Sequence, residues 1–83
     1  MKVLYFAAAR DITQVASDVI SLESMTLQSL TEHLVAKYGD ALRKVLDHAM
    51  YAVNMEYVDK DKESFLQLSP DDEVAVIPPV SGG

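Results

Sequence analysis

The chain has 83 residues, enough for one small domain with a single hydrophobic core and too few for a two-lobed enzyme. Seven basic against thirteen acidic residues give a net charge of −6, which argues against nucleic acid or an anionic membrane surface as partner and favours a basic protein surface. The absence of cysteine excludes disulfides and thiolate nucleophiles, and without a signal peptide or an apolar run of ~20 residues we expect a soluble cytoplasmic protein.

The N-terminal part of the chain predicts two strands. Residues 2–9 are apolar and partly aromatic, which is typical of a strand inside a sheet. Residues 10–14 are polar and predict a loop. From Val15 to Glu23 the side chains alternate with a period of two, as in a half-buried antiparallel strand. We therefore predict that the two strands form a hairpin.

The middle of the chain predicts one main helix and a shorter helical segment. Residues 24–26 supply capping hydroxyls, and Gly39 supplies a stop. The apolar positions between them, three or four apart, are Leu27, Leu30, Leu34 and Tyr38. This spacing predicts an amphipathic helix that covers the sheet. Asp40 is then expected to cap a second segment, with Leu42, Val45 and Leu46 facing inward.

The second half of the chain predicts three further strands. Residues 50–54 form the third, residues 54–56 a tight turn, and residues 57–58 a short fourth strand. Residues 59–64 are charged and predict a surface loop, after which Phe65, Leu66 and Leu68 return to the core. Residues 69–72 predict a turn before the last strand, residues 74–77, whose continuous apolar run indicates a central strand covered on both faces.

These elements predict an α+β fold: a mixed sheet of four to five strands with one main helix packed across it. The helix supplies the long connection that parallel pairing of the first and last strands needs. We expect the domain to comprise residues 1–79 and a projecting tail to comprise residues 80–83.

The tail follows the last strand without a spacer. Pro78 and Pro79 lack an amide hydrogen and hold φ near the polyproline value. The hydrogen-bond ladder of the sheet must therefore stop there, and the chain leaves the sheet in a stiff conformation. Residues 80–83 reach at most roughly 13 Å. Gly82 and Gly83 carry no side chain and can thread a narrow channel, at whose end they present a carboxylate. The alternative is a frayed terminus.

Candidate catalytic side chains are scarce. His33 lies between apolar helix positions and His48 near a helix end, and a lone imidazole makes a poor metal site, so we expect surface roles and no metal. Asp71 and Asp72 fit turn formation better than an acid pair, and Glu73 is expected to face solvent. The four methionines are interpreted as core filling: Met1, Met25, Met50 and Met55.

The whole chain resembles the small subunits of molybdopterin synthase, a family of ubiquitin-like β-grasp sulfur carriers. The opening strand, the Ala52 to Asn54 segment and, above all, the Pro-Pro-Val-Ser-Gly-Gly ending carry the resemblance. Two positions depart from the family pattern: Ile77 stands where an aromatic residue is common, and Asp71 where a glycine is common.

The resemblance implies a carrier whose own chain is not the catalyst. A ubiquitin-activating-type enzyme that uses ATP would adenylate Gly83, and a persulfide donor would leave a thiocarboxylate there. The tail, including Val80, Ser81 and Gly82, would enter the large subunit, which holds the catalytic residues. The sulfur would then be transferred to cyclic pyranopterin monophosphate to build the dithiolene. The resemblance also implies two small and two large subunits and no permanently bound cofactor.

By the same resemblance, the partner interface would consist of residues near the tail: Phe6, Arg10, Ile77, Pro78, Pro79 and Val80. For Phe6 and Ile77 the alternative is ordinary core. Three other functions stay open: a sulfur carrier for thiamine thiazole or another acceptor, a protein modifier joined to lysine amines, and a plain binding module with a disordered end.

Overall fold

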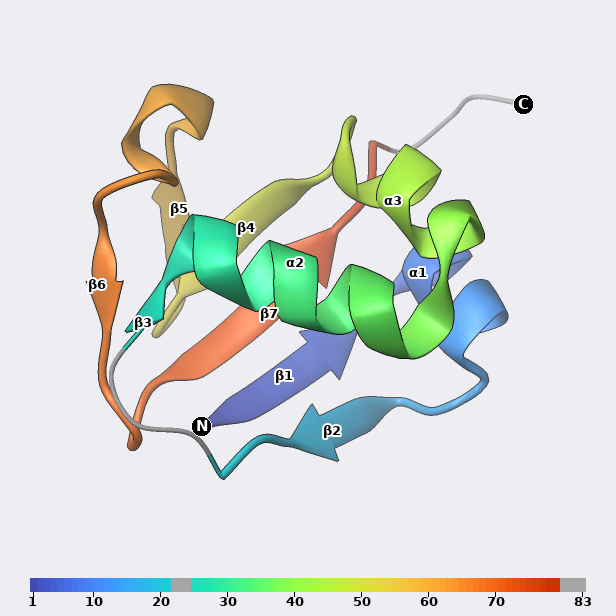
Figure 1. The fold of residues 1–83 in the computed structure, drawn as a ribbon, viewed down its shortest axis with the longest axis horizontal. Helices are drawn as coiled ribbons and strands as arrows, with labels where there is room; N and C mark the ends of the chain where they lie inside the picture. Colours follow the sequence, from blue (N-terminus) through green and yellow to red (C-terminus); the bar gives the residue numbers. More distant parts are fainter. Residues whose placement is uncertain (22–24, 80–83) are drawn as a thin grey trace.

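The computed structural model describes residues 1–21 and 25–79. Its main sheet has five strands in the order β2-β1-β7-β4-β5 (Figure 1). These strands are β1 (Lys2–Tyr5), β2 (Ser17–Val19), β4 (Met50–Val53), β5 (Glu56–Val58) and β7 (Glu73–Ile77). A separate two-stranded sheet pairs β3 (Met25–Thr26) with β6 (Gln67–Leu68). The helices are α1 (Ala7–Thr13), α2 (Leu27–Tyr38), α3 (Asp40–Leu46) and the short 3₁₀ helix η1 (Lys60–Lys62).

The α+β architecture with a mixed five-stranded sheet confirms the predicted fold class. β1 runs parallel to β7, with Val3 opposite Val74, and antiparallel to β2. Because β7 also pairs with β4, the last strand occupies the centre of the sheet. The central position of β7 was predicted from the sequence, and the parallel pairing with β1 is the arrangement for which the helix was expected to supply the long connection.

Helix α2 lies across one face of this sheet and forms the core with it (Figure 1). Its fully buried leucines, Leu27, Leu30 and Leu34, belong to the same cluster as Val74 and Val76 of β7. The Thr26 hydroxyl accepts a hydrogen bond from the Ser29 N–H at 3.1 Å, and Gly39 ends the helix with φ of +90°. The predicted main helix is therefore confirmed, because its cap, apolar stripe and stop are all local signals.

The first prediction that the structure corrects concerns residues 7–14. The strand ends at Tyr5, and residues 7–13 form α1 in place of a strand end and a polar loop. Three alanines in a row favour a helix, since alanine has the highest helix propensity. β1 and β2 are antiparallel as predicted, but α1 intervenes, so they are not a simple hairpin.

Smaller corrections follow from long-range packing. Asp40 is the first residue of α3, and Gly39 occupies the cap position. The residue 59–64 loop contains η1, and Glu56 belongs to β5 rather than to the turn. Phe65 is 64% exposed and is not part of the core, and the predictions for Met50 and Met55 are also wrong because both side chains are exposed. Met1 is buried in the core and Met25 packs against it.

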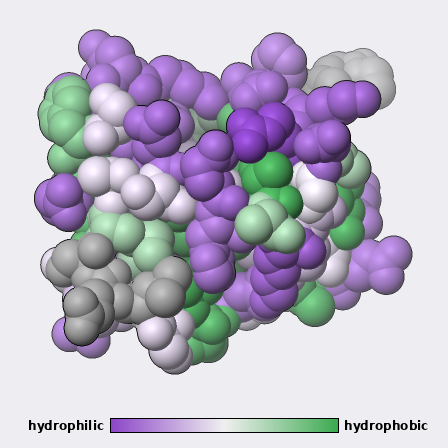
Figure 2. Space-filling view, viewed as in Figure 1, coloured by the Kyte–Doolittle hydropathy of each residue, from purple (hydrophilic) through white to green (hydrophobic). Residues whose placement is uncertain are grey.

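The turn before β7 forms as predicted. The Asp72 N–H donates to the Ser69 carbonyl at 3.0 Å, and the Asp72 carboxylate accepts from the Ser69 N–H at 2.7 Å. The predicted second strand extends only over residues 17–19, and its last predicted residues, 22 and 23, lie outside the described residues. Polar and charged side chains cover much of the molecular face over α2 and α3 (Figure 2).

Candidate functional site

The opposite face of the main sheet is the candidate site. Successive strand residues point to alternate faces. In β7, Val74 and Val76 are fully buried under the helices, whereas Ala75 and Ile77 are only half-buried on the other side. Within the described residues, the helices pack on one face of the sheet only (Figure 1). The prediction that the last strand is covered on both faces is therefore wrong.

Strand register brings the residues of this face together. Ala75 pairs with Leu4 on one side and with Ala52 on the other, and Ala52 pairs with Tyr57. We call the resulting surface the open-face patch. Its members are Leu4, Phe6, Met50, Ala52, Met55, Tyr57, Ala75 and Ile77. Apolar side chains of this number on one solvent-facing surface are typical of a protein interaction site.

Two hollows indent the open-face patch, and they meet at Tyr57 and Ile77. The first has a volume of about 350 Å³ and also includes Phe6 and Met55 in its lining. The second has a volume of about 560 Å³ and is lined by His48, Met50, Tyr57, Ile77, Pro78 and Pro79. The second hollow therefore joins the open-face patch to the two prolines from which the tail departs.

Four of the residues predicted at the partner interface lie on this continuous surface. Phe6 is 47% exposed, Ile77 is half-buried, Pro78 is buried and Pro79 is exposed. Phe6 is thus not ordinary core. Arg10 is exposed in the last turn of α1 and lines neither hollow. The other predicted tail residues lie outside the described residues: Val80, Ser81, Gly82 and Gly83.

Sequence reasoning did not place six members of the open-face patch at the interface, and three of these six have exposed side chains: Met50, Met55 and Tyr57. Tyr57 is 67% exposed and Met55 is 91% exposed. A signal for Tyr57 exists in the sequence, because it precedes the buried Val58 in a strand and must point to the opposite face. No local signal separates an exposed methionine from a core one, since both fit a strand equally well.

A polar clamp fixes the sheet at the end away from the prolines. The Asn54 side-chain amide donates to the Asp72 carboxylate at 3.0 Å, and its oxygen accepts from the Glu73 N–H at 3.0 Å. The hydrogen bond from the Ser69 N–H, together with that from Asn54, lowers the pKa of Asp72 below its ordinary value. The clamp holds the β4–β5 turn against the start of β7, so the strand that leads to the tail is anchored at its base.

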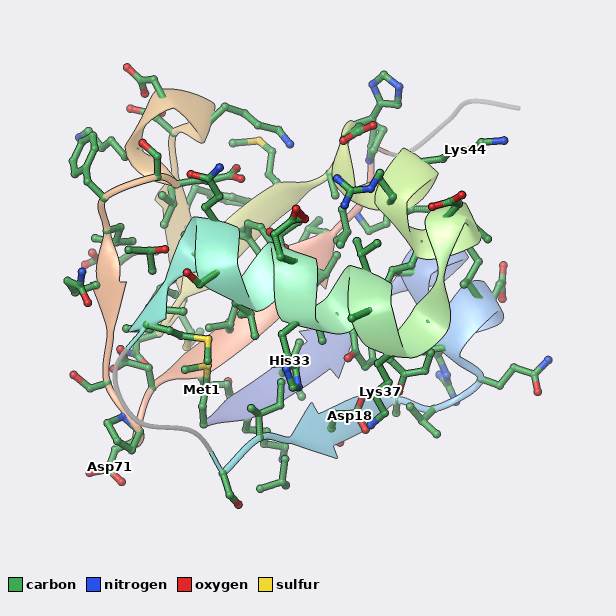
Figure 3. The ribbon with its side chains drawn as sticks, in the orientation of Figure 1. Met1, Asp18, His33, Lys37, Lys44 and Asp71 are labelled. Atoms are coloured by element: carbon green, nitrogen blue, oxygen red, sulfur yellow. The ribbon has the colours of Figure 1, made fainter. Side chains whose placement is uncertain are left out.

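A second polar cluster ties β2 to α2 on the helix side of the sheet. Tyr5, Tyr38 and Lys37 all donate to the Asp18 carboxylate, Tyr5 at 2.8 Å and Lys37 at 3.2 Å. Figure 3 shows Asp18 and Lys37 side by side between the two elements. Desolvation and the hydrogen bond to Asp18 raise the pKa values of Tyr5 and Tyr38, so both phenols stay neutral and donate. This cluster is structural, because its donors are all satisfied by one carboxylate.

The described residues offer no catalytic constellation. His33 and His48 are both exposed, as predicted, and no three His, Cys, Asp or Glu side chains of residues 1–21 and 25–79 gather closely enough to hold a metal ion. In the same ranges, no helix is both long and apolar enough to cross a bilayer.

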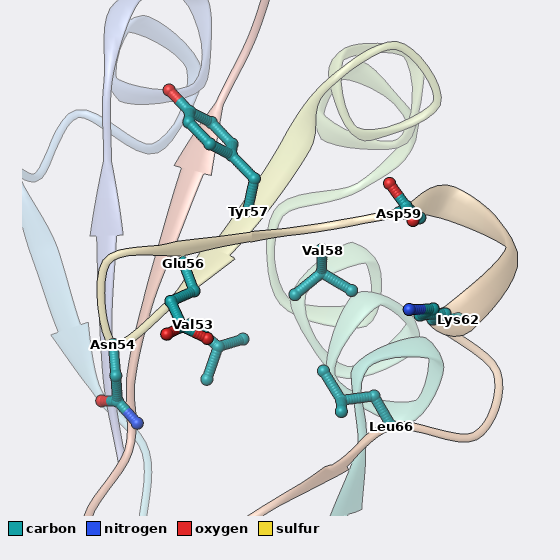
Figure 4. A pocket seen from close by; sticks show the side chains of 8 residues that line it. All are labelled: Val53, Asn54, Glu56, Tyr57, Val58, Asp59, Lys62 and Leu66. Atoms are coloured by element: carbon teal, nitrogen blue, oxygen red, sulfur yellow. The ribbon is translucent and has the colours of Figure 1, made fainter.

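A further hollow lies beside β5 (Figure 4). Val53, Val58 and Leu66 supply its apolar side chains, and Glu56, Asp59 and Lys62 supply its charges. It is near the β4–β5 turn, at the end of β4 opposite Met50 and the prolines. It shares Tyr57 with the open-face patch, but neither Pro78 nor Pro79 lines it.

Sequence comparison shows which known proteins the chain is similar to. The ThiS family model matches residues 3–83. The molybdopterin synthase sulfur carrier subunit of Homo sapiens is 41% identical over 85 residues, covering 100% of this chain and 93% of that protein. The protein of the same name from Chlamydomonas reinhardtii is 39% identical over 85 residues, covering 100% of this chain and 98% of its own length.

Solved structures give the same fold. The small archaeal modifier protein 1 of Methanosarcina acetivorans superposes with a TM-score of 0.77 at 25% identity, covering 99% of this chain and 94% of that one. The HVO 2177 protein of Haloferax volcanii superposes with a TM-score of 0.74 at 27% identity, covering 99% of this chain and 84% of that one. The predicted ubiquitin-like β-grasp fold is thereby confirmed.

Proposed function

Because the chain belongs to the ThiS family, we propose that it is the sulfur carrier subunit of molybdopterin synthase and that Gly83 carries the sulfur. The observation that carries the proposal is the continuity between the open-face patch and the two prolines. An apolar docking surface ends where the tail begins, at the centre of the sheet. A partner that binds the patch would receive the tail in a defined direction.

The chemistry requires activation of the Gly83 carboxylate. An α-carboxyl group with a pKa of about 3.3 to 3.7 is ionised at neutral pH and resists nucleophiles. An adenylating enzyme that uses ATP joins this carboxylate to AMP and releases pyrophosphate. A persulfide sulfur displaces AMP, and cleavage of the acyl disulfide by a thiol leaves the thiocarboxylate. The absence of cysteine from the chain is compatible with this route.

Transfer then takes place in the large subunit, which supplies the catalytic residues. The thiocarboxylate sulfur attacks a carbon of cyclic pyranopterin monophosphate and displaces an oxygen substituent from it. Water then cleaves the acyl–sulfur bond, which leaves the sulfur on the pterin and returns Gly83 as a carboxylate. Two such rounds, each with a newly loaded thiocarboxylate, produce the dithiolene. Phe6, Tyr57 and Ile77 of the open-face patch dock on that subunit while Pro78 and Pro79 direct the tail into it. Arg10 contributes a positive charge at the margin of the docking surface. The assembly contains two small and two large subunits and works in the cytoplasm.

Intact mass tests the proposal directly. Incubation of the full chain with ATP, a sulfur donor and a candidate activating enzyme should raise its mass by about 16 Da, since one terminal oxygen is exchanged for sulfur. Deletion of Gly83 should abolish the shift without changing the circular dichroism spectrum. An unchanged shift in the deleted chain would contradict the assignment, as would no shift in the full chain with an enzyme active on a related carrier.

A protein-modifier role is the second candidate, favoured by the structural similarity to the small archaeal modifier protein 1. Such a role joins the activated carboxylate to lysine amines instead of sulfur. It predicts an isopeptide-linked ladder of products on blots when the activating enzyme and ATP are present without a sulfur donor. A carrier for thiamine thiazole would instead release sulfur to a thiazole-forming enzyme in the same mass assay.

A further inference from the structure

The four methionines of the chain lie in two different environments. Met1 is 8% exposed and Met25 packs against the core, whereas Met50 is 41% and Met55 is 91% exposed. Both exposed methionines belong to the open-face patch, and neither of the other two does. The thioether groups that solvent reaches are therefore those of the docking surface.

Each hollow of the open-face patch has one of these two thioethers in its lining. Met50, which pairs with Ile77 in the sheet, lines the hollow beside the two prolines. Met55 follows β4 in the β4–β5 turn and lines the other hollow, and Tyr57 lines both. A change in the polarity of both sulfur atoms would therefore alter the patch over its whole length.

Methionine is the most readily oxidised side chain of this sequence, because the chain contains no cysteine. The thioether sulfur attacks one oxygen of hydrogen peroxide, and the O–O bond breaks as the S–O bond forms. The sulfur is oxidised by two electrons, and the departing hydroxide takes the proton of the transferred oxygen and leaves as water. The product, methionine sulfoxide, is polar where the thioether was apolar.

A sulfoxide is tolerated on a free surface and unfavourable in a dry interface. In the unbound chain, solvent reaches both Met50 and Met55, so their sulfoxide oxygens are hydrated and the fold should not change. An apolar partner that docks on the patch removes this water, and a polar group buried without a hydrogen-bond partner is costly. Oxidation should therefore weaken docking and leave the fold intact.

We propose that Met50 and Met55 are sites of reversible oxidation by peroxide, and that their sulfoxides prevent the open-face patch from docking. The inference rests on the proposed function, because it takes the large subunit as the docking partner. A carrier oxidised while its patch is free would be withheld from that subunit until a methionine sulfoxide reductase restores the thioethers. In that step a dithiol supplies two electrons and becomes a disulfide, and the oxygen leaves as water.

Exposure and position give the two methionines different parts in this regulation. Met55 is the more exposed of the two and should be oxidised faster. Met50 lies in a strand, in the hollow that the two prolines complete, so its sulfoxide should weaken docking more. The faster reaction and the larger effect are therefore assigned to different residues, which single substitutions can separate.

Peptide mapping of the full chain measures which methionines react. Methionine oxidation and the exchange of a terminal oxygen for sulfur each add about 16 Da, so intact mass alone does not separate them. Trypsin, which cleaves after lysine and arginine, places Met50 and Met55 in residues 45–60 and Gly83 in residues 63–83. Brief treatment with dilute peroxide should oxidise residues 45–60 before Met1 and Met25. Equal or earlier oxidation of Met25 would overturn the proposal.

Calorimetry then measures the affinity of the oxidised chain for the purified large subunit, after catalase has removed the peroxide. The affinity should fall by about tenfold or more, with an unchanged circular dichroism spectrum, and a reductase with dithiothreitol should restore it. If the untreated chain does not bind the large subunit, the proposed function fails. If the untreated chain binds and the oxidised chain binds equally well, the regulatory inference alone fails.

Leucine substitutions supply the matched controls, each variant being measured before and after peroxide. The double variant Met50→Leu/Met55→Leu has no exposed thioether, so peroxide should leave its own affinity unchanged. Met25→Leu keeps both exposed thioethers and should lose affinity after peroxide. Met50→Leu alone should lose less affinity on oxidation than Met55→Leu alone. A peroxide-induced loss in the double variant as large as that in the unmodified chain would overturn the proposal.

Discussion

Ile77 of β7 pairs with Met50 of β4, and the chain passes from Ile77 directly into Pro78. The pair belongs to the open-face patch, and both residues line the hollow that Pro78 and Pro79 complete. The docking surface and the start of the tail are therefore built from the same strand. Under the proposed function, a change on this face should alter partner binding without touching Gly83, the residue proposed to carry the sulfur.

The first prediction concerns Tyr57, which lines both hollows of the open-face patch. Tyr57→Ala should weaken binding to the large subunit by about 2 kcal/mol, or roughly 30-fold, because exposed aromatic residues at the centre of an interface are common hot spots. Isothermal titration calorimetry measures the affinity. The thermal midpoint should change little, since Tyr57 is mostly solvent-exposed.

The matched control for Tyr57 is Phe65→Ala. Phe65 is another exposed aromatic residue, but it lines neither hollow. Its substitution should leave the affinity within twofold of the starting value. If both variants lost affinity equally, the docking surface would not be the open-face patch.

The second prediction concerns the stiffness of the tail. Pro79 is exposed, so Pro79→Ala should leave the fold unchanged and give the free tail more conformations to lose on binding. We expect affinity for the large subunit to fall by about 0.5 to 1 kcal/mol, with thiocarboxylate formation still complete. Single-turnover mass spectrometry and calorimetry separate the two effects. An unchanged affinity would mean that the proline does not preorganise the tail.

The third prediction concerns Asp18. Burial alone would raise its pKa, but the hydrogen bonds from Tyr38, Tyr5 and Lys37 outweigh burial and lower the pKa below the ordinary value of 3.8. A lowered pKa means that the carboxylate stabilises the fold above the unfolded-state pKa and that this stability is lost as pH falls through the folded-state value. Asp18→Asn should therefore reduce the free energy of unfolding by about 2 kcal/mol at pH 7.

Urea denaturation between pH 2 and pH 7 measures this effect. The difference between the Asp18→Asn variant and the unmodified chain should shrink steadily below about pH 4. Lys37→Met removes only the half-exposed partner and should cost less stability than Asp18→Asn. An Asp18→Asn penalty that stays constant with pH would show that the carboxylate charge is not what ties β2 to α2.

The fourth prediction concerns Glu63, whose Oε2 is buried without a hydrogen-bond partner in the described part of the chain. Burial raises the pKa of Glu63, and Lys60, at 3.9 Å, only partly opposes it. The folded state therefore binds the proton more tightly than the unfolded state, and stability declines as pH rises from about 4.3 through the raised value. Glu63→Gln should remove this decline and stabilise the protein by about 1 kcal/mol at pH 7.

Thermal denaturation at pH 4 and pH 7 checks whether the ionised Glu63 carboxylate destabilises the fold. Glu56→Gln, at an exposed carboxylate, is the control and should change stability by less than about 0.5 kcal/mol. A Glu63→Gln variant that is less stable than the unmodified chain at pH 7 would indicate that the ion pair with Lys60 outweighs the burial of the carboxylate.

Elements whose signals are local were predicted well. Helix α2 has its capping threonine, its leucine stripe and its terminal glycine within one stretch, and the structure reproduces all three. The prediction for residues 7–13 was wrong because a run of alanines fits a strand and a helix equally, and periodicity does not separate the two. The prediction that Phe65 belongs to the core was wrong because the exposure of an aromatic residue depends on which distant elements pack around it.

The sequence by itself determined the order of the main elements, the central apolar strand and the proline-led approach to the diglycine, because propensity, capping and the geometry of proline act over a few neighbouring residues. Only the tertiary structure decided that one face of that strand is open and that Met50 and Tyr57 lie there with Phe6 and Ile77. The reason is that strand register and helix placement are set by contacts between residues far apart in the chain, which no local pattern encodes.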